Sequence, residues 1–519
     1  MKYLKKLFFL TIFGLSVFYS RAQKGIIKTY KATSNSEIIN AISKSKAGDC
    51  ILIVPGEYKD IKLVLENSGT ESHPIVLKAE KNGTVIFIGD VKVELKGNHI
   101  VFEGFHFKNG NRNPKEWRSH GPGLVAIYGS NNRVTQCAFH AFDEVPSAYI
   151  TTSLTQQGSV PQHCRIDHCS FTDKTTFDQV INLNNTPKKS TEGAPGIPMY
   201  HRVDHCYFSN PKKPGNAGGG IRIGYWRKDF GRCLIDNNLF ERQDSEPEII
   251  TSKSQENIFY KNTYKNCRGT LNFRHGDKQV ALHNFFITTD KKHEYGGMFV
   301  WGSEHLIASN YFQLNTTIKS RGNAALYLNS GTKGDEHALF YNSQITNNYF
   351  INTNGYAIDF QGLKERRKER CAALDKAYEI PHDIQLKGNV FYSKSQNKKP
   401  FFNIESPKKR NLHWSNNYTH GANLGMPKSN GVLEGKINFN KNNDYFITSK
   451  EFPISTVKTK SIEGLNFDIE EKANLAIFGK PLTWREVGPS WLKENPSTYA
   501  QTGKLSKMLS ARLKKLKKK

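Results

Sequence analysis

The residues best suited to chemistry lie close together in the sequence, within the segment 215–277. Glu246 and Glu248 are two positions apart, and Lys253 and Arg274 are separated by about the length of one short structural repeat. A lysine that has lost its proton can act as a base, and an arginine can assist an oxygen that leaves. This combination predicts proton abstraction next to a carboxyl group rather than hydrolysis.

Asn216, Glu246 and Glu248 supply oxygen atoms of the kind that hard cations prefer. Two carboxylates and an amide oxygen, with room for a substrate, suit a calcium ion. The alternative is that the two glutamates form ordinary surface ion pairs with Lys253 or Arg274. The spacing alone leaves both interpretations open.

The reaction that such a cluster supports is β-elimination on a uronic acid. The C5 proton of the sugar is acidic because it lies beside the carboxylate, and a cation on that carboxylate stabilises the charge that develops. Lys253 serves as the base only when neutral, far below its usual pKa of about 10.4. The positive charges of Arg274 and of a cation would lower that pKa.

The elements that must position these residues follow from a short sequence motif, called here the repeated phrase, that recurs along the chain. Alternating β-branched and polar residues lead into asparagine or His-Cys, then one residue, then an aromatic ring, as in Cys164–Phe171 and His201–Phe208. The aromatic ends of the copies are Phe139, Phe171, Phe208, Phe240, Tyr264, Phe312, Phe350 and Phe391.

These copies predict an all-β fold, a single-stranded right-handed parallel β-helix. Each strand is short and alternates with period two, and loops can lengthen at a corner without disturbing the stack, which explains the uneven spacing. Asparagine tolerates the left-handed conformation at a corner and can form ladders with asparagines of neighbouring coils. A β-propeller is the alternative, but its blades would be more even in length.

The eight cysteines do not form an obvious metal site, because no Cys-x-x-Cys pair occurs. Cys137, Cys169 and Cys206 occupy the same place in the repeated phrase. We therefore expect thiols stacked in the core rather than a framework of disulfides.

The chain divides into three parts in this interpretation. Residues 1–22 carry a basic start and an apolar run, which predicts a secretory signal. Residues 23–440 form the β-helix, with one internal helix expected at 365–377, and residues 441–519 form an irregular extension that packs on the β-helix and ends in a basic tail. We expect a secreted or periplasmic protein with no stable membrane insertion.

The formal net charge is +27, which favours a polyanionic partner. Sulfated or uronate polysaccharides, nucleic acid and an anionic cell surface all meet that description. Part of the charge belongs to the tail Arg512–Lys519, which is interpreted as a solvated end, but the rest of the chain remains strongly basic.

Three motifs give the chain a resemblance to the chondroitinase B family, polysaccharide lyase family six. They are Asn216-Ala-Gly-Gly-Gly-Ile-Arg-Ile-Gly224, Ile249-Ile-Thr-Ser-Lys-Ser-Gln-Glu-Asn257 and Asn272-Phe-Arg-His-Gly-Asp277. The similarity extends along nearly the whole mature chain. It is weakest at 188–198 and after residue 394.

The resemblance implies roles for individual residues. It implies calcium on Asn216, Glu246 and Glu248, with the carboxylate of the substrate completing the shell. Lys253 is then the base and Arg274 acts at the leaving oxygen, and the remaining implied residues are His275 and Glu336 in support of the site and Trp301, Arg321, Arg366, Arg367 and Trp414 in substrate binding. Without the resemblance, Trp301 could equally be a core residue, and Arg366 and Arg367 could form one solvated helix face.

The function expected from these features is cleavage of dermatan sulfate at hexosamine–iduronate linkages, by a monomer that needs Ca²⁺ and binds no nucleic acid. The products would carry a C4=C5 unsaturated uronate. One alternative keeps the mechanism and replaces the substrate by alginate, an unsulfated polyuronate. Another is a β-helix that binds acidic glycans without cutting them.

Overall fold

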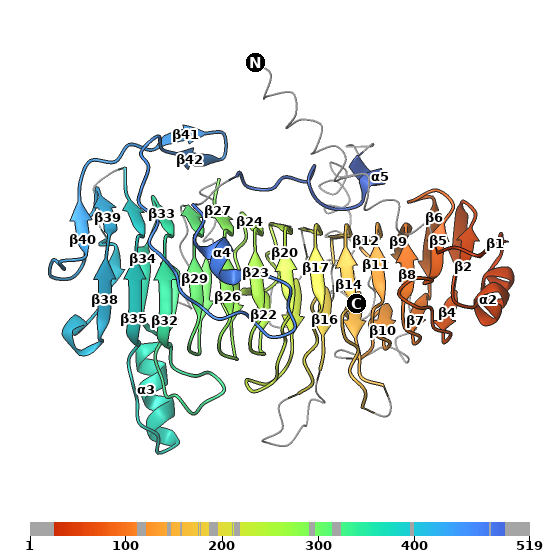
Figure 1. Cartoon of the computed structure of the whole chain (residues 1–519), viewed down its shortest axis with the longest axis horizontal. Helices are drawn as coiled ribbons and strands as arrows, with labels where there is room; N and C mark the ends of the chain where they lie inside the picture. Colours follow the sequence, from red (N-terminus) through yellow and green to blue (C-terminus); the bar gives the residue numbers. More distant parts are fainter. Residues whose placement is uncertain are drawn as a thin grey trace, which may run out of the picture.

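The structure, a computed structural model, consists mainly of three long parallel sheets that wind around one core (Figure 1). It describes residues 25–111, 121–142, 147–155, 158–174, 176, 178–185, 196–209, 211, 218–289, 296–313, 323–394, 399–476 and 479–493. The expected secretory signal and the basic tail lie outside these residues. Among the described residues, no helix is long and apolar enough to cross a membrane.

From β2 to β39 the strands of the three sheets follow one another in rotation along the chain, and every neighbouring pair within the three sheets is parallel. Sheet A contains β1 (Lys28–Ala32), β2 (Asp49–Ile53), β5 (Ile75–Ala79), β8 (Ile100–Glu103), β11 (Arg133–Thr135), β14 (Arg165–Asp167), β17 (Arg202–Asp204), β20 (Leu234–Asp236), β23 (Ile258–Tyr260), β26 (Val280–Leu282), β29 (Leu306–Ala308), β32 (Tyr341–Thr346), β35 (His382–Lys387) and β38 (Leu412–Ser415). Sheet B contains β3 (Gly56–Lys59), β6 (Val85–Gly89), β9 (Phe105–Gly110), β12 (Ala138–His140), β15 (Ser170–Thr172), β18 (Tyr207–Ser209), β21 (Leu239–Glu241), β24 (Thr263–Lys265), β27 (Phe285–Ile287), β30 (Tyr311–Gln313), β33 (Tyr349–Ile351), β36 (Val390–Tyr392), β39 (Asn417–His420) and β40 (Val432–Glu434). Sheet C contains β4 (Lys62–Leu65), β7 (Lys92–Leu95), β10 (Val125–Ile127), β13 (Ile150–Thr152), β16 (Ile181–Leu183), β19 (Ile221–Ile223), β22 (Glu248–Ser252), β25 (Thr270–Phe273), β28 (Met298–Val300), β31 (Ala324–Asn329), β34 (Tyr356–Gly362) and β37 (Phe402–Asn403). The prediction of a parallel β-helix is confirmed, and the β-propeller is excluded.

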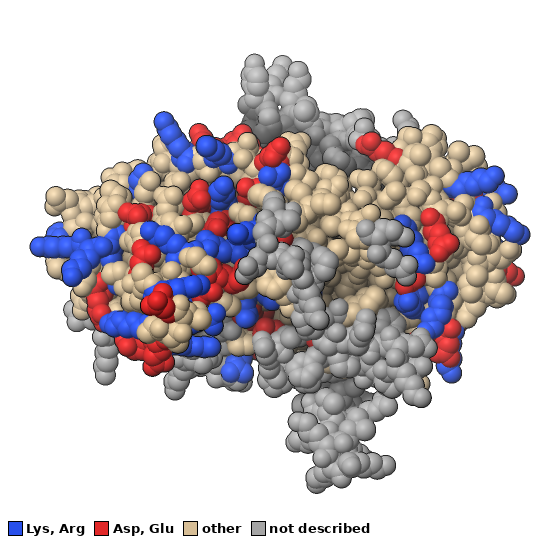
Figure 2. Space-filling model, turned by 90° about the horizontal axis from the view of Figure 1, so that it is seen from below, with Lys and Arg blue, Asp and Glu red and all other residues tan. Residues whose placement is uncertain are grey.

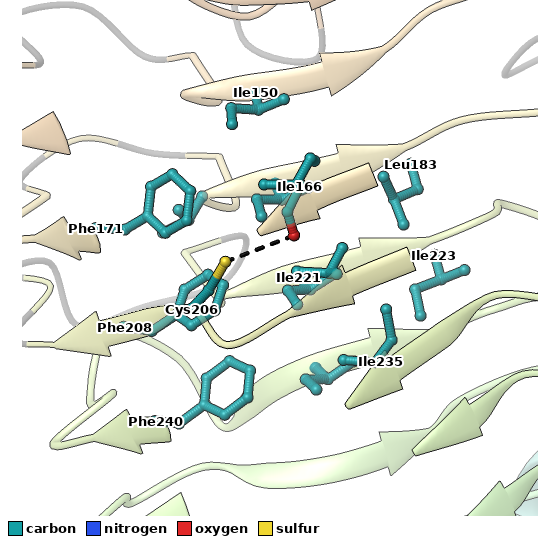
Figure 3. Packing of buried hydrophobic residues seen from close by; sticks show 14 of the residues in the cluster. Ile150, Ile166, Phe171, Leu183, Cys206, Phe208, Ile221, Ile223, Ile235 and Phe240 are labelled. Atoms are coloured by element: carbon teal, nitrogen blue, oxygen red, sulfur yellow. Dashed lines mark hydrogen bonds between the residues drawn. The ribbon is translucent and has the colours of Figure 1, made fainter. Parts of the chain in front are cut away.

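The aromatic ends of the repeated phrase stack on one another inside the helix. Successive rings from Phe139 to Phe391 lie 4.5–5.2 Å apart between centroids, with Phe286 supplying a coil that the sequence comparison missed. Figure 3 shows part of this column, Phe171, Phe208 and Phe240, beside the isoleucines of the other two sheets. All eight cysteines are buried and free, as expected for core thiols. Cys206 points inward, with its sulfur 3.6 Å from the carbonyl oxygen of Ile166 (Figure 3).

The predicted asparagine ladder exists, but the ladder and the left-handed turn belong to different residues. Asn238, Asn262, Asn284, Asn310, Asn348, Asn389 and Asn417 each donate from Nδ2 to Oδ1 of the next, over 2.9–3.1 Å, up to the last member. The residue before the ladder position takes the left-handed conformation, as Asn237 and Asn347 do. Cys206 occupies a ladder position, and its amide donates to Oδ1 of Asn238.

Helices are few among the described residues. The expected helix at 365–377 is shorter, α3 (Lys364–Ala373), and projects from the lower side in Figure 1. A helix that was not predicted, α2 (Asn35–Lys44), covers the N-terminal end of the core with Ile38 and Ile42. The others are η2 (Pro407–Lys409), α4 (Ile469–Ala473) and α5 (Ser490–Lys493).

The C-terminal extension runs back along the outside of the β-helix (dark blue in Figure 1). It starts with a small antiparallel hairpin, β41 (Asn440–Asn442) and β42 (Tyr445–Ile447). Further along, Val457 and Ile469 pack on Ile258 and Leu282 of sheet A. Apolar burial of this kind holds an irregular segment in place without a sheet of its own.

Candidate functional site

The candidate site lies on the outward face of sheet C. The register aligns Arg222, Thr251, Asn272, Phe299 and Tyr327 as neighbours on five successive strands. Their strand neighbours, such as Leu271 and Phe273, point into the core, so the aligned side chains point outward. They form the floor of a surface that changes from polar to aromatic along the axis of the β-helix.

Lys253 and Arg274 stand side by side because they follow adjacent strands. Ser252 of β22 pairs with Phe273 of β25, and the amide of Arg274 donates to the carbonyl oxygen of Ser252 over 2.8 Å. The two residues therefore occupy the same place on neighbouring coils. This separation of one coil is what the sequence spacing predicted.

Glu248 is almost completely buried at the start of β22. Its Oε1 accepts a hydrogen bond of 2.6 Å from Nη1 of Arg274, and its Oε2 accepts one of 2.7 Å from the hydroxyl of Thr251. The ion pair with Arg274 is the contact that the alternative interpretation predicted, and Glu248 here makes it from a buried position.

Glu246 is also buried, but it precedes the strand instead of sharing it. Although they are two positions apart in the sequence, the two glutamates therefore do not share a strand. Pro247 lies between them and has no amide hydrogen for the ladder, and the register shifts between Glu248 and Ile250. Oε2 of Glu246 accepts hydrogen bonds of 2.5 and 2.9 Å from the amides of residues 218 and 219, which turns the carboxylate toward the preceding coil.

The surroundings of Lys253 lower its pKa to about 8. Burial is the largest cause, and the positive charges of Arg274 and Arg222 add to it, against the opposing effect of the two glutamates. The ammonium group lies 4.7 Å from the centre of the Tyr225 ring. About a tenth of Lys253 is therefore neutral at pH 7, and a general base acts in that neutral form.

His275 sits beside this pair in its neutral form. Burial, followed by the neighbouring His337 ring, holds the pKa of His275 well below its usual value. Its Nδ1 lies 3.4 Å from Oε2 of Glu336, and the two histidine rings meet edge to face with centroids 4.6 Å apart. The loop that carries Glu336 is held by Arg227, whose amide donates to Oε2 of Glu336 over 3.0 Å.

A cleft with a volume of about 870 Å³ opens above this floor, between the strands and helix α3. The described residues that line it are Pro247, Glu248, Asn272, Arg274, Phe299, Trp301, His337, Leu363, Arg366, Arg367, Glu369, Arg370 and Ala373. On the face seen from below, Figure 2 shows Lys and Arg gathered among acidic residues over the left half, the end at which α3 projects in Figure 1.

The two arginines that begin α3 have different environments. Arg367 is buried, donates to Oδ2 of Asp335 over 2.8 Å and lies over the Trp301 ring at 4.9 Å. Arg366 is exposed and lines the cleft. Trp301 is itself 4% exposed, so the tryptophan and Arg367 form a packed part of the cleft wall, whereas Arg366 stays exposed to solvent.

Five of the residues implied by the resemblance line the cleft, namely Glu248, Arg274, Trp301, Arg366 and Arg367. Asn216 and Arg321 lie outside the described residues. Trp414 belongs to β38 of sheet A, packs against the rings of Phe360 and Phe402 at the end of the core, and is not among the residues that line the cleft. Its predicted role in substrate binding has no support from this position.

Sequence reasoning did not identify Arg222, Asn272 or His337. Arg222 and Asn272 stand two residues before Gly224 and Arg274 in the motifs already noted, and the period-two alternation from Arg274 points to Asn272 on the same face. His337 lies on a long loop, and no local pattern marks it.

The described residues fit a hard cation in part. No group of three or more histidine, cysteine, aspartate or glutamate residues within the described ranges meets at one point. Glu248 nevertheless brings a buried carboxylate to the cleft, and Glu246 supplies a second buried carboxylate two residues earlier. Both amide atoms of Asn272, which also lines the cleft, lack a hydrogen-bond partner. Oxygen donors of this type are those that calcium prefers.

Comparisons with known proteins agree on the type of fold. The family model described as Chondroitinase B matches residues 32–468. Among solved structures, the family PL6 alginate lyase AlyGC is similar, with a TM-score of 0.71 and 21% identity over 89% of this chain and 58% of that one. The PL6 polysaccharide lyase Pedsa3628 from Pseudopedobacter saltans gives a TM-score of 0.61 and 21% identity over 89% and 99% of the two chains. A mannuronic acid specific PL6 lyase from human gut microbiota gives 0.62 and 19% over 92% and 100%. The comparison with curated proteins gave no significant match.

Proposed function

The chain belongs to the chondroitinase B family, polysaccharide lyase family six, and on that basis we propose that it cleaves an acidic polysaccharide by β-elimination. The substrate that we propose is dermatan sulfate, cut at hexosamine–iduronate linkages. The observation that carries the proposal is the placement of Lys253 beside Arg274, which lines the cleft, with the pKa of Lys253 lowered to about 8.

In the proposed reaction, Lys253 removes a proton from the sugar and Arg274 assists the leaving oxygen. Neutral Lys253 takes the C5 proton of the uronate, and the electrons of the C–H bond form the C4=C5 double bond. The C4–O4 bond breaks at the same time, and Arg274 stabilises the departing oxygen with its guanidinium protons until that oxygen is protonated. No water is consumed, so the new end carries an unsaturated uronate.

The neighbouring residues support this chemistry through charge. Arg222 and Arg274 both favour the neutral form of Lys253. His275 is neutral because of its burial, so it adds no further positive charge beside the base. Its neighbour Glu336 is held by Arg227, which fixes the loop over the site.

Calcium is the cofactor that we propose, held by Glu246 and Glu248 and, by resemblance, Asn216. When bound, it supplies positive charge that makes the C5 proton of the uronate more acidic. Both glutamates are buried within reach of backbone or side-chain donors in the structure, so the cation would join an organised site.

Two observations bear on the choice of substrate. Arg366 and Arg370 line the cleft, and guanidinium groups bind sulfate well, which favours a sulfated chain. The solved relatives named as alginate lyases favour alginate as the alternative, although their identity to this chain is only 21% or below. We also propose that the protein acts as a monomer outside the cytoplasm, consistent with the apolar start of the chain.

The deciding experiment measures the ultraviolet absorbance of the conjugated C4=C5 double bond. Purified protein is incubated with dermatan sulfate, chondroitin 4-sulfate and alginate in parallel, with EDTA or with added calcium. A rise on dermatan sulfate alone, lost with EDTA and restored by calcium, is the expected result. A rise on alginate alone would retain the reaction and replace the substrate. Folded protein that is silent on all three would contradict the lyase proposal and favour a glycan-binding protein.

A further inference from the structure

Asn272 is a buried polar side chain without a partner, at the centre of the cleft floor. It is 1% exposed, and neither Oδ1 nor Nδ2 has a hydrogen-bond partner among the described residues. An unsatisfied buried polar atom costs about 1–3 kcal/mol, and asparagine is poorly suited to the middle of a strand. A residue that lowers stability in this way at a candidate site suggests a missing ligand.

The position of Asn272 places it next to the carboxylate of Glu248. Asn272 pairs in register with Thr251, whose hydroxyl bonds to Glu248, and it lies two residues before Arg274, which bonds to the other oxygen of the same carboxylate. The side chain of Asn272 emerges on the outward face of β25, and Arg274 follows directly after the end of that strand. Asn272 therefore lies between the two groups that hold Glu248.

The size of the missing ligand follows from the burial. Both amide atoms of Asn272 have almost no exposed surface, so a sugar ring cannot reach them unless the surrounding side chains move. A single cation is smaller than a water molecule and needs no such movement. An amide oxygen is a common calcium ligand, and it adds no negative charge beside the existing carboxylates.

We propose that Asn272 supplies an oxygen ligand to the cation bound by Glu246 and Glu248. This inference rests on the proposed function, because it requires that the site binds calcium. Neither the sequence spacing nor the family resemblance assigned Asn272 to the set of cation ligands.

The test is calcium titration calorimetry on the whole protein in the absence of any glycan. Asn272→Ala removes the oxygen and should raise the Kd for calcium at least about tenfold, a loss that even outer-shell residues of metal sites cause. Asn272→Asp keeps an oxygen at the same place and should bind calcium at least as tightly as the unmodified protein. The matched control is Asn182→Ala, at the same outward position on β16, where Nδ2 already donates to Asp178 over 2.8 Å. Its Kd should not change.

The outcomes separate the two proposals. If the unmodified protein binds no calcium, the cation of the proposed function is wrong. If the unmodified protein binds calcium and Asn272→Ala binds it equally well, only the inference is overturned. Weak calcium binding by both Asn272→Ala and Asn272→Asp would also overturn the inference, because the aspartate keeps an oxygen ligand at this position. If Asn272→Ala does not fold, the Asn272→Asp variant decides by the same criterion, and calcium-dependent thermal unfolding provides an independent readout.

Discussion

The outward faces of sheets A and C carry similar charged and polar side chains, but these side chains differ in how completely they are hydrogen-bonded. On sheet A, arginines and aspartates of successive coils form a ladder of paired contacts. Each arginine donates to both carboxylate oxygens of an aspartate one coil further on, over 2.6–2.8 Å, in the pairs Arg133–Asp167, Arg165–Asp204 and Arg202–Asp236. Every aspartate of this ladder is buried, and its carboxylate is satisfied.

On sheet C, the pairing is incomplete. Glu248 and Arg274 form one such contact across a coil, but Nε of Arg274 and both amide atoms of Asn272 lack hydrogen-bond partners among the described residues. Buried polar groups are otherwise nearly always paired. The same architecture thus uses arginine–carboxylate contacts for stability on one face, while on the other it leaves donors and acceptors available to a ligand.

The largest effect that would test this contrast is expected at Lys253. Lys253→Ala removes the proposed base, and the elimination rate should fall by at least about a thousandfold. Binding of the glycan and the thermal unfolding temperature should change little. The matched control is Lys228→Ala, an exposed lysine of the neighbouring loop, which should retain full activity in the absorbance assay. Equal activity of the two variants would contradict the role of Lys253.

The dependence of kcat/KM on pH tests whether Lys253 is the base. The base must be neutral, so kcat/KM should rise with pH and level off above the pKa of about 8 given for Lys253. Arg222→Gln removes one of the charges that lower this pKa, so the inflection should move to higher pH. A profile that falls as the pH rises toward 8 would exclude a lysine base.

A smaller effect, on stability alone, is expected on sheet A. Asp204→Ala leaves Arg165, which is partly exposed, without its paired acceptor, and the free energy of unfolding should decrease by about 2–3 kcal/mol. Chemical denaturation measures this loss. The activity per folded molecule should remain unchanged, and a selective loss of activity would show that the two faces are not separate in function.

The smallest effects separate two adjacent arginines of α3. Arg366→Ala should raise KM for a sulfated substrate by about tenfold, the equivalent of one charged hydrogen bond, with no change in unfolding temperature. Arg367→Ala should instead lower the unfolding temperature, because it breaks the contacts with Asp335 and Trp301. The opposite assignment of the two effects would place Arg367, not Arg366, in contact with the substrate.

Much of the fold was predictable because a β-helix repeats its local pattern. The aromatic column from Phe139 to Phe391 was visible in the sequence, since each coil must place a large ring at the same point of the core. The helix α2 was missed although its start carries a capping box, in which Ser34 accepts from the amide of Glu37 and Glu37 accepts from that of Thr33.

The candidate site was predictable only where its members lie one coil apart. Lys253 and Arg274 could be paired because the interval between them is uninterrupted by a long loop. The position of His337 against His275 depends on a loop from a distant coil, and Trp414 is partly buried against the far end of the core. No pattern in the sequence around His337 or Trp414 indicates where these residues lie.

The sequence by itself determined the β-helical coil, the column of aromatic rings inside it and the spacing of Lys253 and Arg274. These features depend only on the alternation of side chains along a strand and on the number of residues in one coil. The tertiary structure decided which polar atoms remain unpaired. Glu246 turns to the preceding coil after Pro247, Glu248 pairs with Arg274, and Asn272 is left between them. Satisfaction of a buried polar atom depends on all its neighbours in space, and these come from coils whose separation along the chain varies with every loop.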